Sequence, residues 1–487
     1  MPTNSTLSRR RFLQASSASV AGVGLLGSTA LAAKSPNEQI GLGFIGLGGR
    51  GLRLAELFSR QSGARFAAFC EVDRDRLNSA ADKHGVQNRY ISHEDLLDDP
   101  GVDAVVIATC NHWHCLPAIH ACQAGKHVYV EKPLGHDLWQ QQQLIAAARR
   151  YDRVVQVGTQ QRSDPMQAEV RRFLHEEKAL GELQGAIACR LGARAAVGQR
   201  SKPLSPPDSV DVDRWFGPAA RAPMYRDKFH YDWHWDWATG NGEMGNWGVH
   251  VLDDVRNVVL NDSVAAPTAV AGLGARAAWD DAGQTPNVHV SLFETPAMPI
   301  ACIINNLREP KGAEPPRLGG VAAGYVVSCE GGRYEGRRGG GRAYDASGKL
   351  VREFTGSSGE REHCGNFLEA VRQNDRHLLT ADVQVGHDSS SWCHYGNAAY
   401  LAGVPASASQ IDSVVGEAAP WRHAVESVRG WMGELGISAD DAPFKASAWR
   451  AIDSETGRVA GAADDASSRV YRGEYRQGYA IPDVMGA

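Results

Sequence analysis

A lysine in the first third of the chain stands where two motifs would bring it beside a nucleotide. The residues Glu131-Lys132-Pro133 close a short apolar run at 127–130, and the glycine-rich stretch Gly46-Leu47-Gly48-Gly49-Arg50-Gly51 lies upstream. Such a run indicates a buried parallel strand, and doubly wound sheets bind ligands at the carboxyl ends of their strands. An ammonium group at that edge, near a loop suited to pyrophosphate, makes hydride transfer the leading hypothesis.

The glycine spacing predicts a dinucleotide site. Gly46 allows a tight turn, Gly48 lets backbone amides approach the pyrophosphate, and Gly51 allows the following helix to pack closely on the strand. Glu71 ends the second predicted strand, where a carboxylate would accept hydrogen bonds from the ribose hydroxyls and favour NAD. Arg74 could serve a 2'-phosphate instead, so NADP stays open as the alternative. The predicted cofactor-binding residues are Gly46, Gly48, Gly49, Arg50, Gly51, Glu71, Thr109, Asn111, His114, Glu131 and Lys132.

Regularly spaced apolar runs predict the sheet that positions these residues. The runs lie at 40–45, 66–70, 104–108, 127–130 and 154–157. Helical patterns, such as the one at 116–124, separate them. Strands that alternate with helices predict a parallel sheet, so we expect a Rossmann dinucleotide-binding domain over residues 36–160.

The pattern changes after Arg162, where strand-like segments follow one another without regular helices between them. These segments lie at 186–191, 288–293, 300–304 and 325–329. They predict an α/β domain with an open, mostly antiparallel sheet over 161–405, in which helical patterns return at 362–402. We expect residues 406–487 to form an irregular extension with one amphipathic helix near 421–435.

The N-terminus, with Ser8-Arg9-Arg10-Arg11-Phe12-Leu13 before a mild apolar stretch at 15–31, resembles a twin-arginine export signal. Ala30-Leu31-Ala32 offers a small-residue cleavage site, which predicts a signal peptide at 1–33 and a periplasmic protein without stable membrane insertion. An uncleaved N-terminal membrane anchor is the alternative.

The composition limits the class of partner. The 487 residues carry a net charge of -5, which argues against a nucleic-acid partner. Four arginines among glycines, at 333, 337, 338 and 342, indicate a solvated loop rather than a binding patch, within a Gly-rich hairpin region at 330–348. The nine cysteines are odd in number and form no C-x-x-C pair, which excludes a full disulfide framework.

Four stretches together resemble the Gfo/Idh/MocA oxidoreductase family, and especially its exported members. They are the glycine loop at 46–51, the loop Thr109-Cys110-Asn111-His112-Trp113-His114, the segment 125–133 and the segment 157–162. The resemblance runs from about residue 40 to 401. It implies a Rossmann domain followed by an open-sheet domain, sugars or polyols as substrates, and dimers or tetramers formed through that sheet.

The same resemblance implies roles for three residues. Lys132 matches the active-site lysine, which would hydrogen bond the substrate oxygen that becomes a carbonyl, and the peptide before Pro133 is cis in many relatives. His250 matches the catalytic histidine and would act as general base. Four residues earlier this chain has Asn246 in place of the usual aspartate, which puts the proton relay in doubt because an amide cannot accept a proton at neutral pH.

An aromatic and acidic segment precedes that motif. Tyr231, Trp235, Asp236 and Trp237 could form a sugar subsite, with a packed aromatic core as the alternative. Arg162, which ends a family-like segment, is also assigned to the substrate. His112 and His114 could join His250 around a metal, but no acidic partner accompanies them at ligand spacing, so we predict no metal.

Two functional classes follow. The first is an NAD(P)-dependent oxidoreductase that acts on a hydroxyl of a sugar, glycoside or polyol. The second is a redox-neutral glycosidase that oxidises a sugar transiently, eliminates the glycosidic bond and returns the hydride. The intact Glu131-Lys132-Pro133 favours the first class, because the best-known hydrolytic relatives depart from it. A non-catalytic sugar-binding protein is a third possibility, and the retained Lys132 and His250 count against it.

Overall fold

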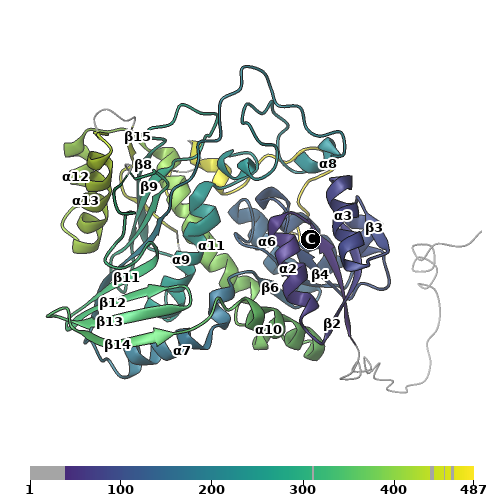
Figure 1. Ribbon diagram of the computed structural model, residues 1–487, viewed down its shortest axis with the longest axis horizontal. Helices are drawn as coiled ribbons and strands as arrows, with labels where there is room; N and C mark the ends of the chain where they lie inside the picture. Colours follow the sequence, from purple (N-terminus) through teal and green to yellow (C-terminus); the bar gives the residue numbers. More distant parts are fainter. Residues whose placement is uncertain (1–38, 310–311, 439–443, 454–455, 462–465, 487) are drawn as a thin grey trace, which may run out of the picture. The chain divides into compact units, whose positions relative to one another are not determined.

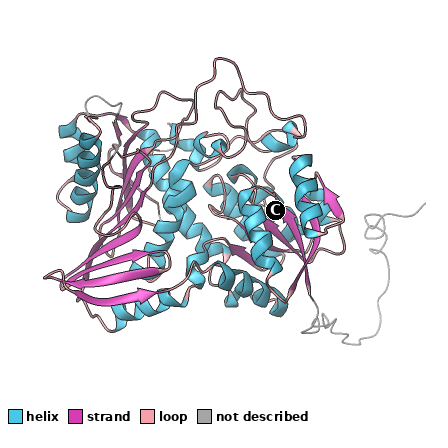
Figure 2. Ribbon diagram, viewed as in Figure 1, coloured by secondary structure: helices cyan, strands magenta, loops and turns pink. Residues whose placement is uncertain are grey.

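The computed structural model describes residues 39–309, 312–438, 444–453, 456–461 and 466–486. The predicted export signal at 1–33 lies outside the described residues. The chain from Asn37 on forms one compact unit. Within that unit lie two sheets, each flanked by helices (Figures 1 and 2).

The first sheet is six-stranded and parallel, in the order β3-β2-β1-β4-β5-β6. Its strands are β1 (Ile40–Ile45), β2 (Ala64–Cys70), β3 (Asn88–Tyr90), β4 (Ala104–Ile107), β5 (His127–Val130) and β6 (Val155–Val157). The helices between them are α2 (Gly49–Ser59), α3 (Arg74–His84), α4 (His93–Leu97), α5 (Cys115–Gln123) and α6 (Leu138–Arg150). The predicted Rossmann fold is confirmed, although β3 was not predicted because its Asn-Arg-Tyr sequence is largely exposed and gives no apolar signal.

The register of this sheet brings the ends of its central strands together. Ile45 of β1 pairs with Cys70 of β2 and with Ile107 of β4, and Ile107 in turn pairs with Val130 of β5. The glycine loop and the residues that follow β2, β4 and β5 therefore emerge side by side, which is the edge where such sheets bind ligands.

The second sheet has eleven strands and is mostly antiparallel, as predicted; among the described strands only β7 and β10 pair in parallel. Its order is β14-β13-β12-β11-β7-β10-β9-β8-β16-β15, with β17 also pairing with β8. The strands are β7 (Leu183–Leu191), β8 (Ala269–Ala275), β9 (Val288–Glu294), β10 (Ile300–Asn305), β11 (Ala323–Cys329), β12 (Gly332–Arg337), β13 (Gly340–Asp345), β14 (Leu350–Thr355), β15 (Val404–Pro405), β16 (Lys445–Ala446) and β17 (Arg450–Ala451). The accompanying helices are α7 (Pro165–Arg171), α8 (Val212–Phe216), α9 (Val249–Asp254), α10 (Glu360–Gln373), α11 (Val383–Ala402), α12 (Ala408–Val415) and α13 (Ala419–Glu434).

Helices cover both faces of the middle of this sheet. Along β10, Cys302 and Ile304 belong to the core shared with α9 and α11, whereas Ala301 and Ile303 belong to the core shared with α12 and α13. This alternation follows from the two-residue period of a strand. In Figure 1, α12 and α13 lie on the outer side of the sheet, and α9 and α11 lie between it and the first sheet. The predicted amphipathic helix is α13, and α12 extends the helical part of the extension.

Late segments of the chain complete the Rossmann domain. Phe367 of α10 packs edge-on against Phe58 and Tyr129, with ring centroids 6.2 and 5.8 Å apart. The hydroxyl of Tyr475 donates to a carboxylate oxygen of Asp137 at 2.8 Å, close to the N-terminus of α6. The dinucleotide-binding domain therefore takes part of its core from sequence well beyond residue 160.

All nine cysteines are free thiols, and eight of them are buried. Within the described part of the chain, no helix combines the length and the apolar character needed to cross a membrane.

Candidate active site

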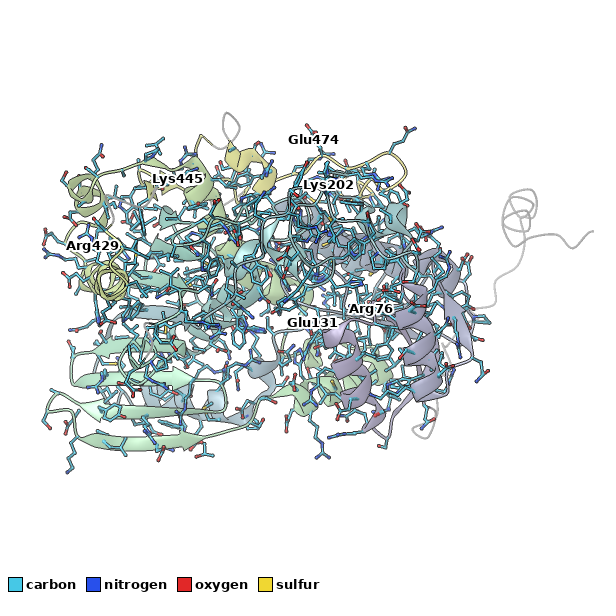
Figure 3. All side chains as sticks on the ribbon, turned by 45° about the horizontal axis from the view of Figure 1, so that its top comes forward. Arg76, Glu131, Lys202, Arg429, Lys445 and Glu474 are labelled. Atoms are coloured by element: carbon cyan, nitrogen blue, oxygen red, sulfur yellow. The ribbon has the colours of Figure 1, made fainter. Side chains whose placement is uncertain are left out.

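A cleft of about 620 Å3 opens at the carboxyl ends of β1, β2, β4 and β5. A segment of the second domain around residues 230–246 lines its other side. Arg76 and Glu131, both labelled in Figure 3, line the Rossmann side. The predicted cofactor residues that line the cleft are Gly46, Gly48, Gly49, Arg50, Glu71, Thr109, Asn111, His114, Glu131 and Lys132.

The glycine loop has the geometry of a pyrophosphate cradle. Gly46 has a φ of +89°, and a Cβ at Gly51 would lie 2.1 Å from the carbonyl oxygen of Gly46. Gly49, by contrast, would place a Cβ in open space, and α2 begins there with no side chain capping its first amides. Uncapped amides at a helix N-terminus are an anion site, so the loop fits a dinucleotide.

Backbone amides hold the carboxylate that was predicted to bind the ribose. The carboxylate of Glu71 accepts from the backbone N–H of Leu47 at 2.8 Å and of Asp73 at 3.2 Å, and burial raises its pKa. Arg76 lines the cleft near it, whereas Arg74, the predicted alternative phosphate ligand, is exposed. The arginine that could discriminate NADP from NAD is therefore Arg76.

On the Rossmann side, two cleft-lining residues carry a buried polar atom with no hydrogen-bond partner among the described residues, namely Thr109 Oγ1 and Arg50 Nη2. The other donors of Arg50 are engaged: its Nε lies 2.7 Å from Glu131 Oε1, and it also pairs with Glu360 at the start of α10. Unsatisfied buried groups at a cleft are what a bound ligand would satisfy. The chain thus fits a nicotinamide dinucleotide along its Rossmann edge.

Lys132 sits where the two domains meet. The Lys132–Pro133 peptide is cis, and the buried ring of His114 faces both the Pro133 carbonyl oxygen, at 2.6 Å, and that of Thr109, at 3.2 Å. The Lys132 ammonium donates to Asn246 O at 2.9 Å and to Asn246 Oδ1 at 3.3 Å. Burial lowers the pKa of Lys132 from 10.5 to about 8, against the opposing charge of Glu131. Two of the three ammonium donors are engaged, and one remains for a ligand.

A buried carboxylate fixes the amide that holds this lysine. Glu243, fully buried, accepts from Asn246 Nδ2 at 3.0 Å and is itself paired with Arg194 at 2.8 Å. A carboxylate can only accept hydrogen bonds, so the nitrogen of the Asn246 amide must face Glu243 and its oxygen must face Lys132. Glu243 was not predicted as a site residue. Its position three residues before Asn246, about one helical turn away, could have indicated that the two side chains meet.

The side chain of His250 is 9% exposed and does not line the cleft. Its ring centroid lies 5.6 Å from that of Trp247. Burial, followed by the positive charges of Arg338, Lys132 and Arg50, holds the pKa of His250 well below its usual value. The imidazole is therefore neutral at neutral pH and lies within the field of the Lys132 ammonium.

The segment with these arginines forms the β12–β13 hairpin, in agreement with the predicted hairpin region. Arg338 lies at its tip, and its guanidinium donates to Gln160 Oε1 at 3.3 Å, next to the Rossmann domain. Arg333 and Arg342 pair with Glu335 and Glu353 along the strands. The prediction failed for Arg338 because a hairpin tip contacts residues that are far away in the sequence.

The aromatic segment divides between the cleft and the core. Tyr231 lines the cleft and is 49% exposed, whereas Trp235 is 4% exposed and, with Asp236, borders a separate small cavity. Trp237 lies outside the cleft lining as well, and its neighbours Trp233 and His234, which the sequence analysis did not select, line it. Asp232–Trp235 form a short 3-10 turn. The period of a strand or an α-helix therefore could not predict which of these residues line the cleft and which lie outside it.

Arg162 also lies outside the cleft lining. Its side chain is 3% exposed, and its guanidinium pairs with Asp253 at 2.7 Å and with Asp262 at 2.7 Å. A guanidinium whose donors are occupied by two carboxylates holds the domain together and has little left for a substrate.

Two of the histidines considered for a metal, His112 and His114, direct their ring nitrogens at backbone carbonyl oxygens. His112 directs its two ring nitrogens at the carbonyl oxygens of Thr239 and Trp215. Among the described residues, a different trio lies close enough for a metal, comprising His93, Glu94 and His120. The Nδ1 of His93 lies 3.1 Å from the Glu94 carboxylate, and its Nε2 lies 2.9 Å from Nδ1 of His120. The two partners therefore contact opposite edges of the His93 ring.

Two family models match the chain in order. The model "Oxidoreductase family, NAD-binding Rossmann fold" matches residues 40–159, and "Oxidoreductase family, C-terminal alpha/beta domain" matches residues 195–287. Both belong to the Gfo/Idh/MocA group.

Curated relatives resemble part of the chain. An uncharacterized oxidoreductase, YrbE, of Bacillus subtilis is 32% identical over 26% of this chain and 38% of its own length. The myo-inositol 2-dehydrogenase of Thermotoga maritima is 33% identical over 25% of this chain and 37% of its own. A glycosyl hydrolase family 109 protein of Shewanella baltica is 31% identical over 29% of this chain and 37% of its own. The likeness thus covers less than two fifths of each of these relatives.

Solved structures share most of the fold at low identity. The aldose-aldose oxidoreductase from Caulobacter crescentus, complexed with glycerol, has a TM-score of 0.56 and 17% identity, and the match covers 74% of this chain and 97% of that one. Levoglucosan dehydrogenase in complex with NADH and levoglucosan gives the same values. At this identity the likeness establishes the fold alone. Two models of one oxidoreductase family thus match consecutive parts of this chain, and the first of them describes an NAD-binding Rossmann fold.

Proposed function

We propose that the protein is an NAD(P)-dependent oxidoreductase that oxidises a hydroxyl of a sugar, glycoside or polyol, with Lys132 and His250 at its catalytic centre. The observation that carries this proposal is that Lys132 lines the same cleft as the glycine loop and keeps one N–H after its two contacts with Asn246. Relatives named for myo-inositol and levoglucosan support the substrate class.

Bound NAD supplies the acceptor for a hydride. The Lys132 ammonium stabilises the negative charge that develops on the substrate oxygen. His250 lies outside the cleft lining, so this proposal has the substrate oxygen extend past Lys132 to the neutral imidazole of His250, which takes the hydroxyl proton. Asn246 orients the ammonium without accepting a proton itself. Lys132 and His250 thus act on the same oxygen in different ways.

The test begins with mass spectrometry of nucleotide released from gently purified protein. Levoglucosan, myo-inositol and a set of aldoses are then added while the absorbance of reduced nicotinamide is followed. We expect bound NAD(H) and its reduction by at least one sugar, and we expect Lys132→Met to retain the nucleotide without reducing it. Protein that neither carries nor binds a nicotinamide nucleotide would contradict any hydride role.

A redox-neutral glycosidase is the second candidate, and the likeness to a glycosyl hydrolase family 109 protein favours it. The intact Glu131-Lys132-Pro133 counts against it. Cleavage of an aryl glycoside with no net change in nicotinamide absorbance would select this candidate over the dehydrogenase.

We also propose that the N-terminal twin-arginine segment directs the protein to the periplasm, with an uncleaved anchor as the alternative. The intact mass of protein recovered from periplasmic extracts distinguishes the two. Association into a homo-oligomer stays a prediction. Because α12 and α13 cover the outer face of β7–β10, a second copy would have to pack over β11–β14.

A further inference from the structure

An imidazole of the second domain lines the cleft. His234 lines the cleft together with Lys132 and Asn246, and it is 9% exposed. Its Nδ1 is buried and has no hydrogen-bond partner among the described residues. Of the buried polar atoms without a partner, those on cleft-lining residues belong to Arg50, Thr109 and His234, and only His234 lies on the second domain.

The backbone holds this imidazole rigidly. Tyr231 has a φ of +73°, which is rare for a side chain of its size and marks local strain. The hydroxyl of Thr239 donates to the Trp233 carbonyl oxygen at 2.9 Å, and a Cβ at Gly240 would lie 2.5 Å from the carbonyl oxygen of His234. The Trp233 ring lies 3.6 Å from the His234 ring, centroid to centroid. A polar ring fixed this firmly without a partner is preorganised for a ligand.

Its charge state suits a hydroxyl. Burial, followed by the positive charges of Lys132 and Arg194, holds the pKa of His234 well below its usual value. The neutral ring has one N–H, which can donate to the substrate oxygen while the proton of that oxygen goes to His250. Other buried histidines, such as His112, instead direct both ring nitrogens at backbone carbonyls.

We propose that His234 hydrogen bonds the substrate hydroxyl that Lys132 polarises, so that the substrate binds between Lys132 and the turn at 231–234. The inference rests on the proposed function and places the substrate within the cleft. It makes His234 a catalytic residue beside His250, since it touches the reacting hydroxyl.

The first test measures binding to the nucleotide-loaded protein by calorimetry, with levoglucosan and myo-inositol as probes. His234→Phe should weaken binding about tenfold, the scale of one hydrogen bond, whereas His234→Asn, which keeps an N–H donor, should restore most of it. His289→Phe is the matched control, because His289 also has a buried, unpartnered Nδ1 but lies outside the cleft lining, and it should leave binding unchanged. Equal loss in His234→Phe and His289→Phe, or no loss in either, would overturn the proposal.

The second test does not depend on the choice of sugar. Diethyl pyrocarbonate modifies neutral, accessible imidazoles, and peptide mass spectrometry locates the products. We expect modification of His234 well before His112, and slower modification when a bound polyol protects it. If His234 resists the reagent as His112 does, the proposal fails. If His234 reacts but neither probe binds the wild-type protein, the proposed substrate class is wrong while His234 is supported as a ligand-facing residue.

Discussion

The two sides of the cleft are built on different principles. On the Rossmann side, backbone groups dominate: consecutive strand ends, a left-handed glycine and the uncapped amides of α2 shape the surface. On the side of the second domain, side chains dominate: Arg194, Glu243 and Asn246 form a buried chain of contacts that ends at Lys132. The shape of the first side is therefore set by the backbone path, and the shape of the second side is set by contacts between side chains.

This difference predicts how each side fails. A side chain added to a glycine surface blocks the close approach of a ligand to the backbone. A changed charge in a side-chain network instead shifts the pKa of its neighbours. Substitutions on the two sides should therefore separate loss of nucleotide from loss of turnover.

The largest expected effect is at the glycine loop. A Cβ at Gly48 meets only Arg76 Nη1, at 3.4 Å, so the valine side chain in Gly48→Val extends into the cleft and blocks the nucleotide without disturbing the core. We expect complete loss of NAD(H) from the purified protein, measured by mass spectrometry, with a thermal midpoint equal to that of the nucleotide-free wild type. Gly430→Val on α13, where a Cβ meets nothing within 4 Å, is the control and should retain the nucleotide.

The next effect is at the chemical centre. Lys132→Met should lower turnover by roughly two to three orders of magnitude, comparable to loss of an oxyanion donor, while bound nucleotide is unchanged. His250→Ala should lower it on the order of a hundredfold and remove the acidic limb of the pH–rate profile, because only the neutral imidazole accepts a proton. Since the pKa of His250 is depressed, that limb in the wild type should lie below pH 6.5, the usual pKa of histidine. Near wild-type single-turnover hydride transfer in both variants would favour a binding protein.

A smaller effect is expected at Glu243, whose negative charge raises the pKa of Lys132. Glu243→Gln removes that charge and releases the orientation of Asn246, so the lysine should lose its proton at a lower pH than in the wild type. The alkaline limb of the rate profile, near pH 8 in the wild type, should move to lower pH, with turnover reduced by about tenfold. Acetylation of Lys132, followed by peptide mass spectrometry across pH, checks the same shift without a substrate. Glu335→Gln, which alters a buried glutamate paired with Arg333, is the control, and an equal shift there would refute the role of Glu243.

The smallest effect is expected from Asn246→Asp. The new carboxylate would lie beside Glu243, where the wild-type amide nitrogen is 3.0 Å from the Glu243 carboxylate, so the two acids should share one proton rather than both ionise. The net charge near Lys132 then changes little, and turnover should stay within about tenfold of the wild type. A large rise in the pH of the alkaline limb would show that both acids are ionised.

The sequence predicted the backbone side of the cleft well, and for a physical reason. Each element there is local: a glycine spacing, an apolar run and the residue that follows it, such as Glu71 or Lys132, lie within a few positions of one another. The other side depends on contacts across long stretches of chain. Asn246 and Lys132 are 114 residues apart, and Arg338 and Gln160 are 178 apart, so no local period could bring them together.

The same contrast explains the aromatic segment. Composition singled out Tyr231, Trp235, Asp236 and Trp237, but which of them reach the cleft depends on the positive φ at Tyr231 and the turn after it. Of these four, Tyr231 alone lines the cleft, together with the unselected Trp233 and His234.

The place of α10 has a consequence for how the chain is made. Phe367 and Leu368 of this helix belong to the same core as Leu42 and Phe44 of β1, although more than three hundred residues of sequence separate the two groups. During synthesis the ribosome releases β1 to β6 long before α10, so part of one apolar face of the early sheet stays uncovered until α10 is made. We therefore expect a chain stopped at residue 160 to aggregate or to need a chaperone, and the nucleotide to be captured only after α10 has docked.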